Sequence, residues 1–308
     1  MFRLIRNAKI WFIVSALGIL LSLAAILTLG LRVGIDYRGG TVIELESNNT
    51  ARLAGISDVL KERGYNNPQI KESGGNKVIL RLPHLSNEEH TSLSAALTEK
   101  IPDLREVRYD TVGPTIGRDL TNRSIIAVVL ASLGIIFYIA YAFRKLPRPL
   151  SSWIFGLSAI VALIHDLLIT TGIVAILGYF FHWMEVDALF ITALLTIMGF
   201  SVHDTIVVYD RLRENFLKNP HRAIGLSAEE SVNQTLVRSI NTSLTVILVL
   251  LTLIILGSES IRHFTLTLAV GVFIGTYSSV FVASPLVVIW HKRKAMPQKA
   301  RSRRLAAA

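Results

Sequence analysis

Six long and nearly uncharged apolar runs constrain the fold of this chain more than any other feature. A helix needs about 20 apolar residues to cross a hydrocarbon layer of roughly 30 Å, and each run approaches or exceeds that length. The runs cover residues 11–31, 125–143, 153–179, 186–209, 240–256 and 264–290. The sequence therefore predicts a membrane protein with six transmembrane helices.

Composition points to the same class. A mean hydropathy of +0.50 and a hydrophobic content of 51% over 308 residues exceed what one soluble core can bury. The first run is too long for a removable signal peptide and lacks a small-residue cleavage site, so we expect it to remain as a helix. The sequence contains no cysteine, which excludes disulfides and cysteine metal sites.

Lysine and arginine fall almost entirely on one side of the six predicted helices. Short loops rich in these residues stay in the cytoplasm. They precede the first run, join the second to the third, and follow the fourth and the sixth, whereas the opposite short loops hold only Arg262. Tryptophans at predicted helix ends agree with this placement; they are Trp11, Trp153, Trp183 and Trp290. We therefore predict that both termini are cytoplasmic and that residues from about 33 to 122 lie outside.

The formal charge of +10 does not indicate nucleic-acid binding once it is counted by compartment. Residues 33–122 hold 11 basic and 13 acidic side chains, so the positive excess is cytoplasmic. The basic tail after residue 291 is explained by contact with anionic membrane lipids and by control of topology. We therefore expect lipid contact and no nucleic-acid partner.

The outer segment has the mixed hydrophobic pattern of a small soluble domain. Its predicted elements are a strand over residues 35–45, a helix over 51–63, strands over 68–72 and 77–82 around Gly74-Gly75, a helix after Ser86, and a strand over 105–112. Ser86 and Glu89 have the spacing of a capping box at the start of the second helix. The order βαββαβ predicts an inserted α+β domain of the ferredoxin-like type.

These predictions divide the chain into four parts. Residues 1–32 form the cytoplasmic N-terminus and the first transmembrane helix, and residues 33–122 form the extracytoplasmic ferredoxin-like domain. Residues 123–291 form transmembrane helices two to six, and residues 292–308 form the basic cytoplasmic tail. The predicted fold class is an all-α membrane bundle of six helices with one inserted α+β domain.

Two aspartates lie inside apolar runs, Asp166 in the third and Asp204 in the fourth. A charged residue near the centre of a membrane helix costs about 2.5–3.5 kcal/mol on insertion scales, so such residues mark functional sites by default. Arg238 stands at the mouth of the fifth run, and the antiparallel course of the two helices places it at a depth similar to that of Asp204. The sequence therefore predicts that Asp204 and Arg238 can pair.

Two interpretations of this pair remain open from the residues alone. In the first, Asp204 and Arg238 form a static buried ion pair, while Asp166 and His165 only hydrogen-bond neighbouring helices. In the second, a helix movement changes the contact of Asp204 with Arg238 and so switches the protonation of the carboxyl group, which makes a proton relay. Asp166, Ser201 and His203 are further candidates for the relay, and Ser201 and His203 also suit a packing or hydrogen-bonding role.

Glycine-rich segments flank the outer domain where it joins the membrane helices. Gly39-Gly40 permits positive φ or a close backbone approach after the first helix. Gly113-Pro114 and Gly117 make a compact exit into the second helix. Residue type alone favours tight connections at these points, and a hinge that transmits membrane motion is the alternative.

Three segments together resemble the SecF family of protein-export membrane proteins. They are residues 34–41 (GIDYRGGT), residues 113–117 (GPTIG) and residues 199–215 (GFSVHDTIVVYDRLREN). The resemblance covers nearly the whole chain. It implies membership in the resistance-nodulation-division superfamily and a place in the bacterial inner membrane. The family's membrane aspartate and arginine correspond to Asp204 and Arg238, whereas His203 stands where the family often has asparagine.

The resemblance implies SecD as a partner and use of the proton-motive force to assist export of unfolded polypeptide through the SecYEG translocon. YajC and YidC are further partners that it implies. No GxxxxGK[ST] loop, nucleophile triad or HExxH motif occurs in the sequence, so we expect no enzyme activity and no cofactor other than the coupling proton. Two other functions remain open, namely half of a proton-coupled small-molecule exporter and a passive translocon scaffold.

Overall fold

The computed structural model describes residues 3–47, 54–65, 68–73, 76–144, 151–181 and 183–293. The chain divides into two compact units, one made of residues 1–32 with 126–308 and the other of residues 33–125. The predicted turn at Gly74-Gly75 and most of the basic tail lie outside the described residues.

Six helices in the described residues are long and apolar enough to cross a membrane, which confirms the predicted number. They are α1 (Ala8–Thr28), α5 (Pro114–Ala142), α6 (Ser152–Phe180), α7 (Ala188–Lys218), α8 (Ile224–Leu256) and a last helix spanning Ser260–Arg293. The last helix comprises α9 (Glu259–Ser278), a π-helical turn η2 (Ser279–Ala283) and a further helical stretch. At about 1.5 Å per residue, α8 is about 50 Å long and exceeds the hydrocarbon layer.

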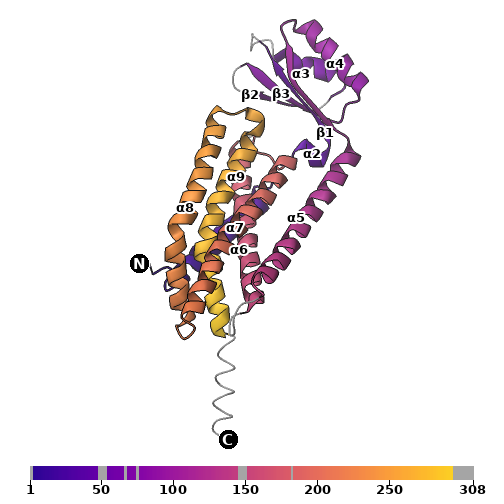
Figure 1. The fold of residues 1–308 in the computed structure, drawn as a ribbon. Helices are drawn as coiled ribbons and strands as arrows, with labels where there is room; N and C mark the ends of the chain where they lie inside the picture. The colour runs from indigo at the N-terminus through magenta and orange to yellow at the C-terminus, as the bar shows by residue number, and fades with distance from the viewer. Residues whose placement is uncertain are drawn as a thin grey trace. The chain divides into compact units, whose positions relative to one another are not determined.

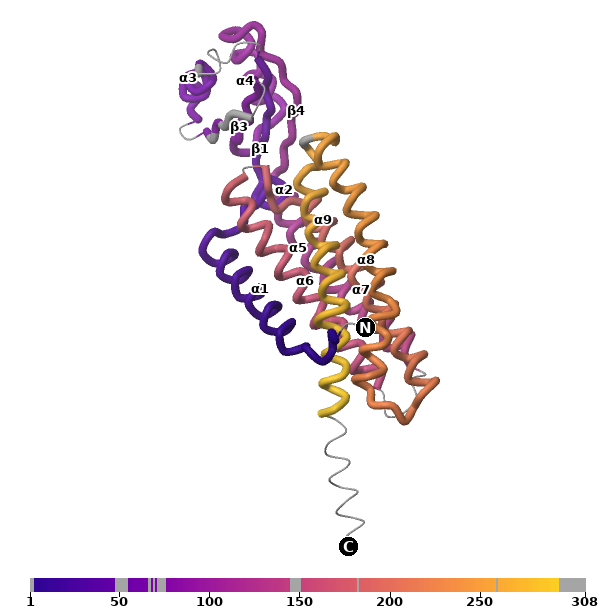
Figure 2. Tube along the Cα trace, turned by 90° about the vertical axis from the view of Figure 1, so that its left-hand side faces the viewer, coloured from indigo at the N-terminus to yellow at the C-terminus, as the bar shows by residue number. Residues whose placement is uncertain are grey.

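The bundle core lies where α6, α7 and α9 meet. Half of the apolar window of both α6 and α7 is buried, against 6% for α5 and 17% for α1 and α8. Figure 1 shows α7, α8 and α9 side by side, and Figure 2 shows α1 beside α6. The exposed apolar faces of α5 and α8 are the surfaces that lipid would solvate.

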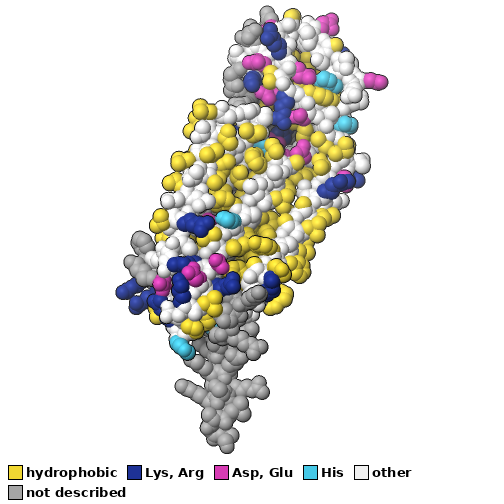
Figure 3. Space-filling model, viewed as in Figure 1, with side chains coloured by type: hydrophobic (Ala, Val, Ile, Leu, Met, Phe, Trp, Pro, Cys, Tyr) yellow, Lys and Arg dark blue, Asp and Glu magenta, His cyan; other side chains and the backbone are white. Residues whose placement is uncertain are grey.

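Lysine and arginine side chains gather at one end of the bundle. Figure 3 shows hydrophobic side chains over α5 and α8, with lysine and arginine gathered at the end where α7 connects to α8. This connection follows Lys218 and contains Arg222. The distribution agrees with a protein whose middle layer faces hydrocarbon.

The unit of residues 33–125 contains a four-stranded antiparallel sheet in the order β2-β3-β1-β4. The strands are β1 (Gly40–Glu46), β2 (Gln69–Ser73), β3 (Lys77–Leu82) and β4 (Arg105–Val112). The helices α3 (Ala54–Glu62) and α4 (Asn87–Lys100) pack on it over a core that includes Ile43, Leu60, Leu80 and Leu93. A bulge between Glu44 and Leu45 shifts the pairing of β1 with β4.

Two local predictions for this unit have clear outcomes. The capping box is confirmed, because Ser86 Oγ accepts from Glu89 N at 3.2 Å and Glu89 Oε2 accepts from Ser86 N at 2.8 Å. The predicted strand over residues 35–45 is wrong in its first part. Residues Ile35–Arg38 form a one-turn helix, α2, which Gly39 ends with φ of 73° before β1 begins.

Candidate functional site

Asp166 lies at the centre of the contact between α6, α7 and α9, where its side chain is completely buried. Its Oδ2 atom accepts from Ser201 Oγ of α7 at 2.6 Å and from Ser278 Oγ of α9 at 2.7 Å. Its Oδ1 atom lies 2.9 Å from Nδ1 of the neighbouring His165. Three partners at short distance hold this carboxyl group in one position, as buried charge requires.

Asp204 lies on α7, three residues beyond Ser201, and its side chain is 3% exposed. Among the described residues, it accepts a long hydrogen bond of 3.4 Å from Thr276 Oγ1 of α9. Thr276 is also hydrogen-bonded to Ser243 of α8. Asp204 therefore occupies a three-helix contact like that of Asp166, but with a longer and weaker bond.

Arg238 is exposed on α8, and within the described residues no ion pair joins it to Asp204. The predicted direct pairing is thus not formed in this conformation and remains a prediction for another one. His203 is also exposed, next to Asp204, and is not part of the buried contact.

Small residues on α9 let α7 approach it closely at the level of both aspartates. A Cβ atom added at Gly271 would lie 2.1 Å from Ile197 Cδ1, and one added at Gly275 would lie 2.9 Å from Ser201 Cβ. One turn further on, Ser279 Oγ donates to the carbonyl oxygens of Gly275 and Ser201. This close packing fixes the register in which Ser201 and Ser278 reach Asp166.

The glycine motifs of the unit of residues 33–125, which we call the outer unit after its predicted position, form a tight backbone contact. A Cβ atom at Gly39 would lie 3.1 Å from Pro114 Cα, and one at Gly117 would lie 3.1 Å from the Tyr37 carbonyl oxygen. Gly40 has φ of 135°, and its added Cβ would lie 3.1 Å from the Leu82 carbonyl oxygen. Gly113 carries no such crowding from backbone. The arrangement agrees with tight connections and does not by itself indicate a hinge.

Several residues of the aspartate contacts were not among the predicted site residues. These are Thr276 and Ser278 on α9 and Ser243 on α8. A hydroxyl side chain within an apolar run, at the predicted membrane depth of an aspartate, is the sequence feature that could have identified these residues. Such residues are common in membrane helices for packing alone, so the sequence could not separate them.

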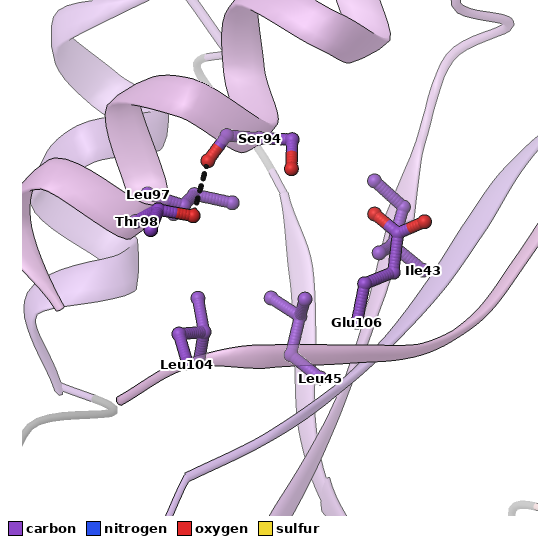
Figure 4. A pocket seen from close by; sticks show the side chains of 7 residues that line it. All are labelled: Ile43, Leu45, Ser94, Leu97, Thr98, Leu104 and Glu106. Carbon is purple, nitrogen blue, oxygen red and sulfur yellow. Dashed lines mark hydrogen bonds between the residues drawn. The ribbon is translucent and has the colours of Figure 1, made fainter. Parts of the chain in front are cut away.

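The outer unit contains a cavity of about 20 Å³ between α4 and the sheet, roughly the space of one water molecule. Figure 4 shows Ile43, Leu45, Leu97 and Leu104 lining it, with Ser94 and Thr98 on α4 and Glu106 beside Ile43. Its size excludes a small-molecule site, which usually occupies about 300–1,000 Å³.

Comparison with known proteins decides the family. The profile for "Protein export membrane protein SecD/SecF, C-terminal" matches residues 92–293, and the profile for the "SecD/SecF GG Motif" matches residues 24–51. This chain belongs to the SecD/SecF family of protein-export membrane proteins. The GG-motif match includes Gly39 and Gly40, and the longer match includes both membrane aspartates.

Members of the SecD/SecF family named protein translocase subunit SecF align with this chain along its length. The relative from Thermobaculum terrenum is 43% identical over 309 residues, which cover 95% of each chain. The relative from Anaerolinea thermophila is 37% identical and 94% of each chain is covered.

The solved structures that match are of SecDF. One, a translocon-associated membrane protein from Thermus thermophilus, has a TM-score of 0.80 and 33% identity over 94% of this chain. A second structure, of SecDF in a super-membrane-facing form, has a TM-score of 0.70 and 31% identity. This chain spans about two fifths of the length of those SecDF chains.

Proposed function

We propose that this chain is a SecF subunit that works with SecD and uses the proton-motive force to assist protein translocation through SecYEG. The proposal places it in the bacterial inner membrane with both termini in the cytoplasm. It assigns YajC, YidC and membrane lipids as further contacts, and translocating unfolded polypeptide as the substrate. It includes no enzyme activity and no cofactor apart from the coupling proton.

The observation that carries the proposal is the difference between the two buried aspartates. Asp166 has three partners at 2.6–2.9 Å, whereas among the described residues Asp204 accepts a hydrogen bond of 3.4 Å from Thr276 and forms no ion pair with Arg238. A weakly held carboxyl group can gain and lose a proton with little disturbance of its surroundings. We therefore assign proton binding to Asp204 and a positioning role to Asp166.

The coupling follows from the elements that hold these groups. Protonation of Asp204 removes its attraction for Arg238, and deprotonation restores it, so the distance between α7 and α8 depends on the proton. Ser201 transmits a shift of α7 to Asp166 and thereby to α6 and α9. A membrane potential supplies about 2.3 kcal/mol per charge per 100 mV, which biases a two-state equilibrium more than tenfold.

We also propose that residues 33–125 form a ferredoxin-like domain. The antiparallel order β2-β3-β1-β4, with helices in the two connections β1–β2 and β3–β4, supports this assignment. In the proposed cycle this domain contacts the emerging polypeptide. An experimental structure of the domain with a different strand order would overturn the assignment.

The function is tested with inverted membrane vesicles that carry this chain, its SecD-like partner and the translocon. The rate of import of a secreted protein is measured with and without a proton gradient. The natural chain should lose most of its stimulation when an uncoupler collapses the gradient, and Asp204→Asn should lack stimulation in both conditions. Full stimulation by Asp204→Asn would favour a passive scaffold. Purification of the natural chain as a self-paired assembly without SecD would favour a small-molecule exporter.

A further inference from the structure

Helix α8 carries a row of five buried hydroxyl side chains at intervals of four residues. They are Ser227, Ser231, Thr235, Ser239 and Ser243, and each is at most 6% exposed. Residues four apart are neighbours on a helix surface, and a row of five at this spacing turns by about 160° around the helix axis. We call this row the α8 hydroxyl stripe, and it faces the contacts of α8 with α7 and α9.

One end of the α8 hydroxyl stripe reaches Asp204. Ser243 is hydrogen-bonded to Thr276, and Thr276 donates to Asp204 Oδ2 at 3.4 Å. Thr276 of α9 thus connects the carboxyl group on α7 to Ser243, the last hydroxyl of the stripe on α8.

The other end reaches the connection between α7 and α8. Ser231 Oγ accepts from Asn215 Nδ2 of α7 at 2.9 Å, and Asn215 also donates to Gln234 Oε1 at 2.9 Å. Gln234 Oε1 is bonded to the half-exposed Arg211. Ser227 lies three residues after the start of α8 at Ile224. The stripe therefore begins among side chains that reach solvent.

Two hydroxyls of the stripe are buried without a hydrogen-bond partner among the described residues, those of Ser227 and Ser239. The other three donate to the carbonyl oxygen four residues earlier, at 2.6–2.9 Å. A buried hydroxyl without a partner is costly, and polar buried sites of this kind bind water. Successive hydroxyls are about 6 Å apart along the helix axis, which one water molecule bridges and a direct hydrogen bond does not.

We propose that the α8 hydroxyl stripe binds a chain of water molecules. This chain conducts the proton between Asp204 and the aqueous side of the membrane on which the α7–α8 connection lies. The O–H bond of protonated Asp204 breaks, its proton passes to water, and an equivalent proton leaves at the Ser227 end, so that Asp204 remains as a carboxylate. This inference deepens the proposed function and rests on it for the identity of the proton donor.

Cysteine accessibility tests the water path without relying on transport. The natural chain has no cysteine, so single variants report one position each. Ser239→Cys and Ser227→Cys are produced with the SecD-like partner in inverted and right-side-out membrane vesicles. Thr170→Cys is the matched control, because Thr170 Oγ1 on α6 is also buried without a partner but lies off the stripe. The probe is a small, charged, membrane-impermeant methanethiosulfonate, which reacts with the thiolate and releases a sulfinate.

The stripe variants should react at least about tenfold faster than Thr170→Cys, because thiolate forms only where water reaches. The reaction should occur from the side of the α7–α8 connection. Equal and slow reaction at all three positions, or reaction of Ser239→Cys only from the opposite side, would overturn the water path.

Measurement of proton flux is the second test of the water path. Ser239→Ala removes one unpaired hydroxyl and no folded-state hydrogen bond, so it should assemble normally and slow proton uptake about fivefold, the worth of one hydrogen bond. Ser239→Thr should restore the rate, and Thr170→Val should not lower it. If Asp204→Asn abolishes flux and Ser239→Ala leaves it unchanged, the stripe is refuted and the proposed function survives. If Asp204→Asn retains full flux, the proposed function fails, and the accessibility result then decides the water path alone.

Discussion

Ser201 Oγ donates to Asp166 Oδ2 at 2.6 Å, although the two residues are 35 positions apart in the chain. This bond joins α7 to α6 three residues before Asp204. Gly275 of α9 lies against the same serine, so three helices meet at one side chain. A change at Asp204 that moves α7 therefore acts on the surroundings of Asp166.

Replacement of Asp166 by alanine should destabilise the bundle. Ser201 would lose the acceptor of its hydroxyl and His165 its ring partner, while Ser278 would keep only the Gly275 carbonyl oxygen, and an unsatisfied buried polar group costs about 1–3 kcal/mol. The apparent Tm of the purified complex in mild detergent measures the loss. Asp119→Ala is the control, because Asp119 forms an exposed pair with Arg123 and should change stability by less than about 0.5 kcal/mol. Equal effects of the two substitutions would contradict a positioning role for Asp166.

Gly271→Ala should weaken the contact between α7 and α9. The new methyl group would overlap Ile197, and overpacking of this kind costs about 1–3 kcal/mol. Gly199→Ala on α7 is the matched helical control, since an added Cβ there meets no atom within 4 Å. Thermal unfolding should separate the two variants, and Ile197→Ala should recover part of the Gly271→Ala loss in a double-mutant cycle. If Ile197→Ala recovers none of the stability lost in Gly271→Ala, the overlap with Ile197 is not the cause of that loss.

The sequence predicted the six membrane helices because burial in lipid demands long apolar runs, and such runs are visible without knowledge of packing. It also located both aspartates, since charge in such a run stands out. The length of α8 was underestimated, because the helix begins at Ile224 and not near residue 240. The early part of this helix is polar, and its hydroxyls are buried by α7, a contact that no local pattern reveals.

The partners of the aspartates were not predictable for a related reason. Ser278 and Thr276 are two positions apart on α9, yet one bonds Asp166 and the other Asp204. Which aspartate each hydroxyl meets depends on helix rotation and register. Those are set by the close approach of Gly271 to Ile197, a tertiary property.

Gly39→Ala should destabilise the outer unit. Gly39 has φ of 73° and ψ of 159°, a region that is almost confined to glycine, and a Cβ there would crowd Pro114. Such strain costs about 1–3 kcal/mol. Hydrogen exchange of β1 amides in the full complex should become faster. Gly55→Ala on α3 is the control, because it meets nothing within 4 Å and should leave exchange unchanged or slower. Equal exchange in both variants would contradict the strained backbone at Gly39.

The start of α4 should lose protection in acid. The pKa of Glu89 is lowered below its ordinary value of 4.5. The hydrogen bond from Ser86 N is the main cause, and the Ser86 side chain is the second. A lowered folded pKa gives stability that is present above the ordinary value and is lost as pH falls through the lowered one. Hydrogen exchange of the first α4 turn, corrected for intrinsic rate, should show this loss in the natural chain. Glu89→Gln should show no such pH dependence, and a parallel loss in that variant would contradict the assignment to Glu89.

The central claim is that Asp204 binds the coupling proton under the influence of Arg238. Proton uptake into liposomes that contain this chain with its SecD-like partner tests it most directly, with an imposed potential and a pH-sensitive dye inside. The natural complex should take up protons, whereas Asp204→Asn and Arg238→Met should each reduce the rate at least about tenfold while the complex stays assembled. Uptake at the natural rate by assembled Asp204→Asn would contradict the account.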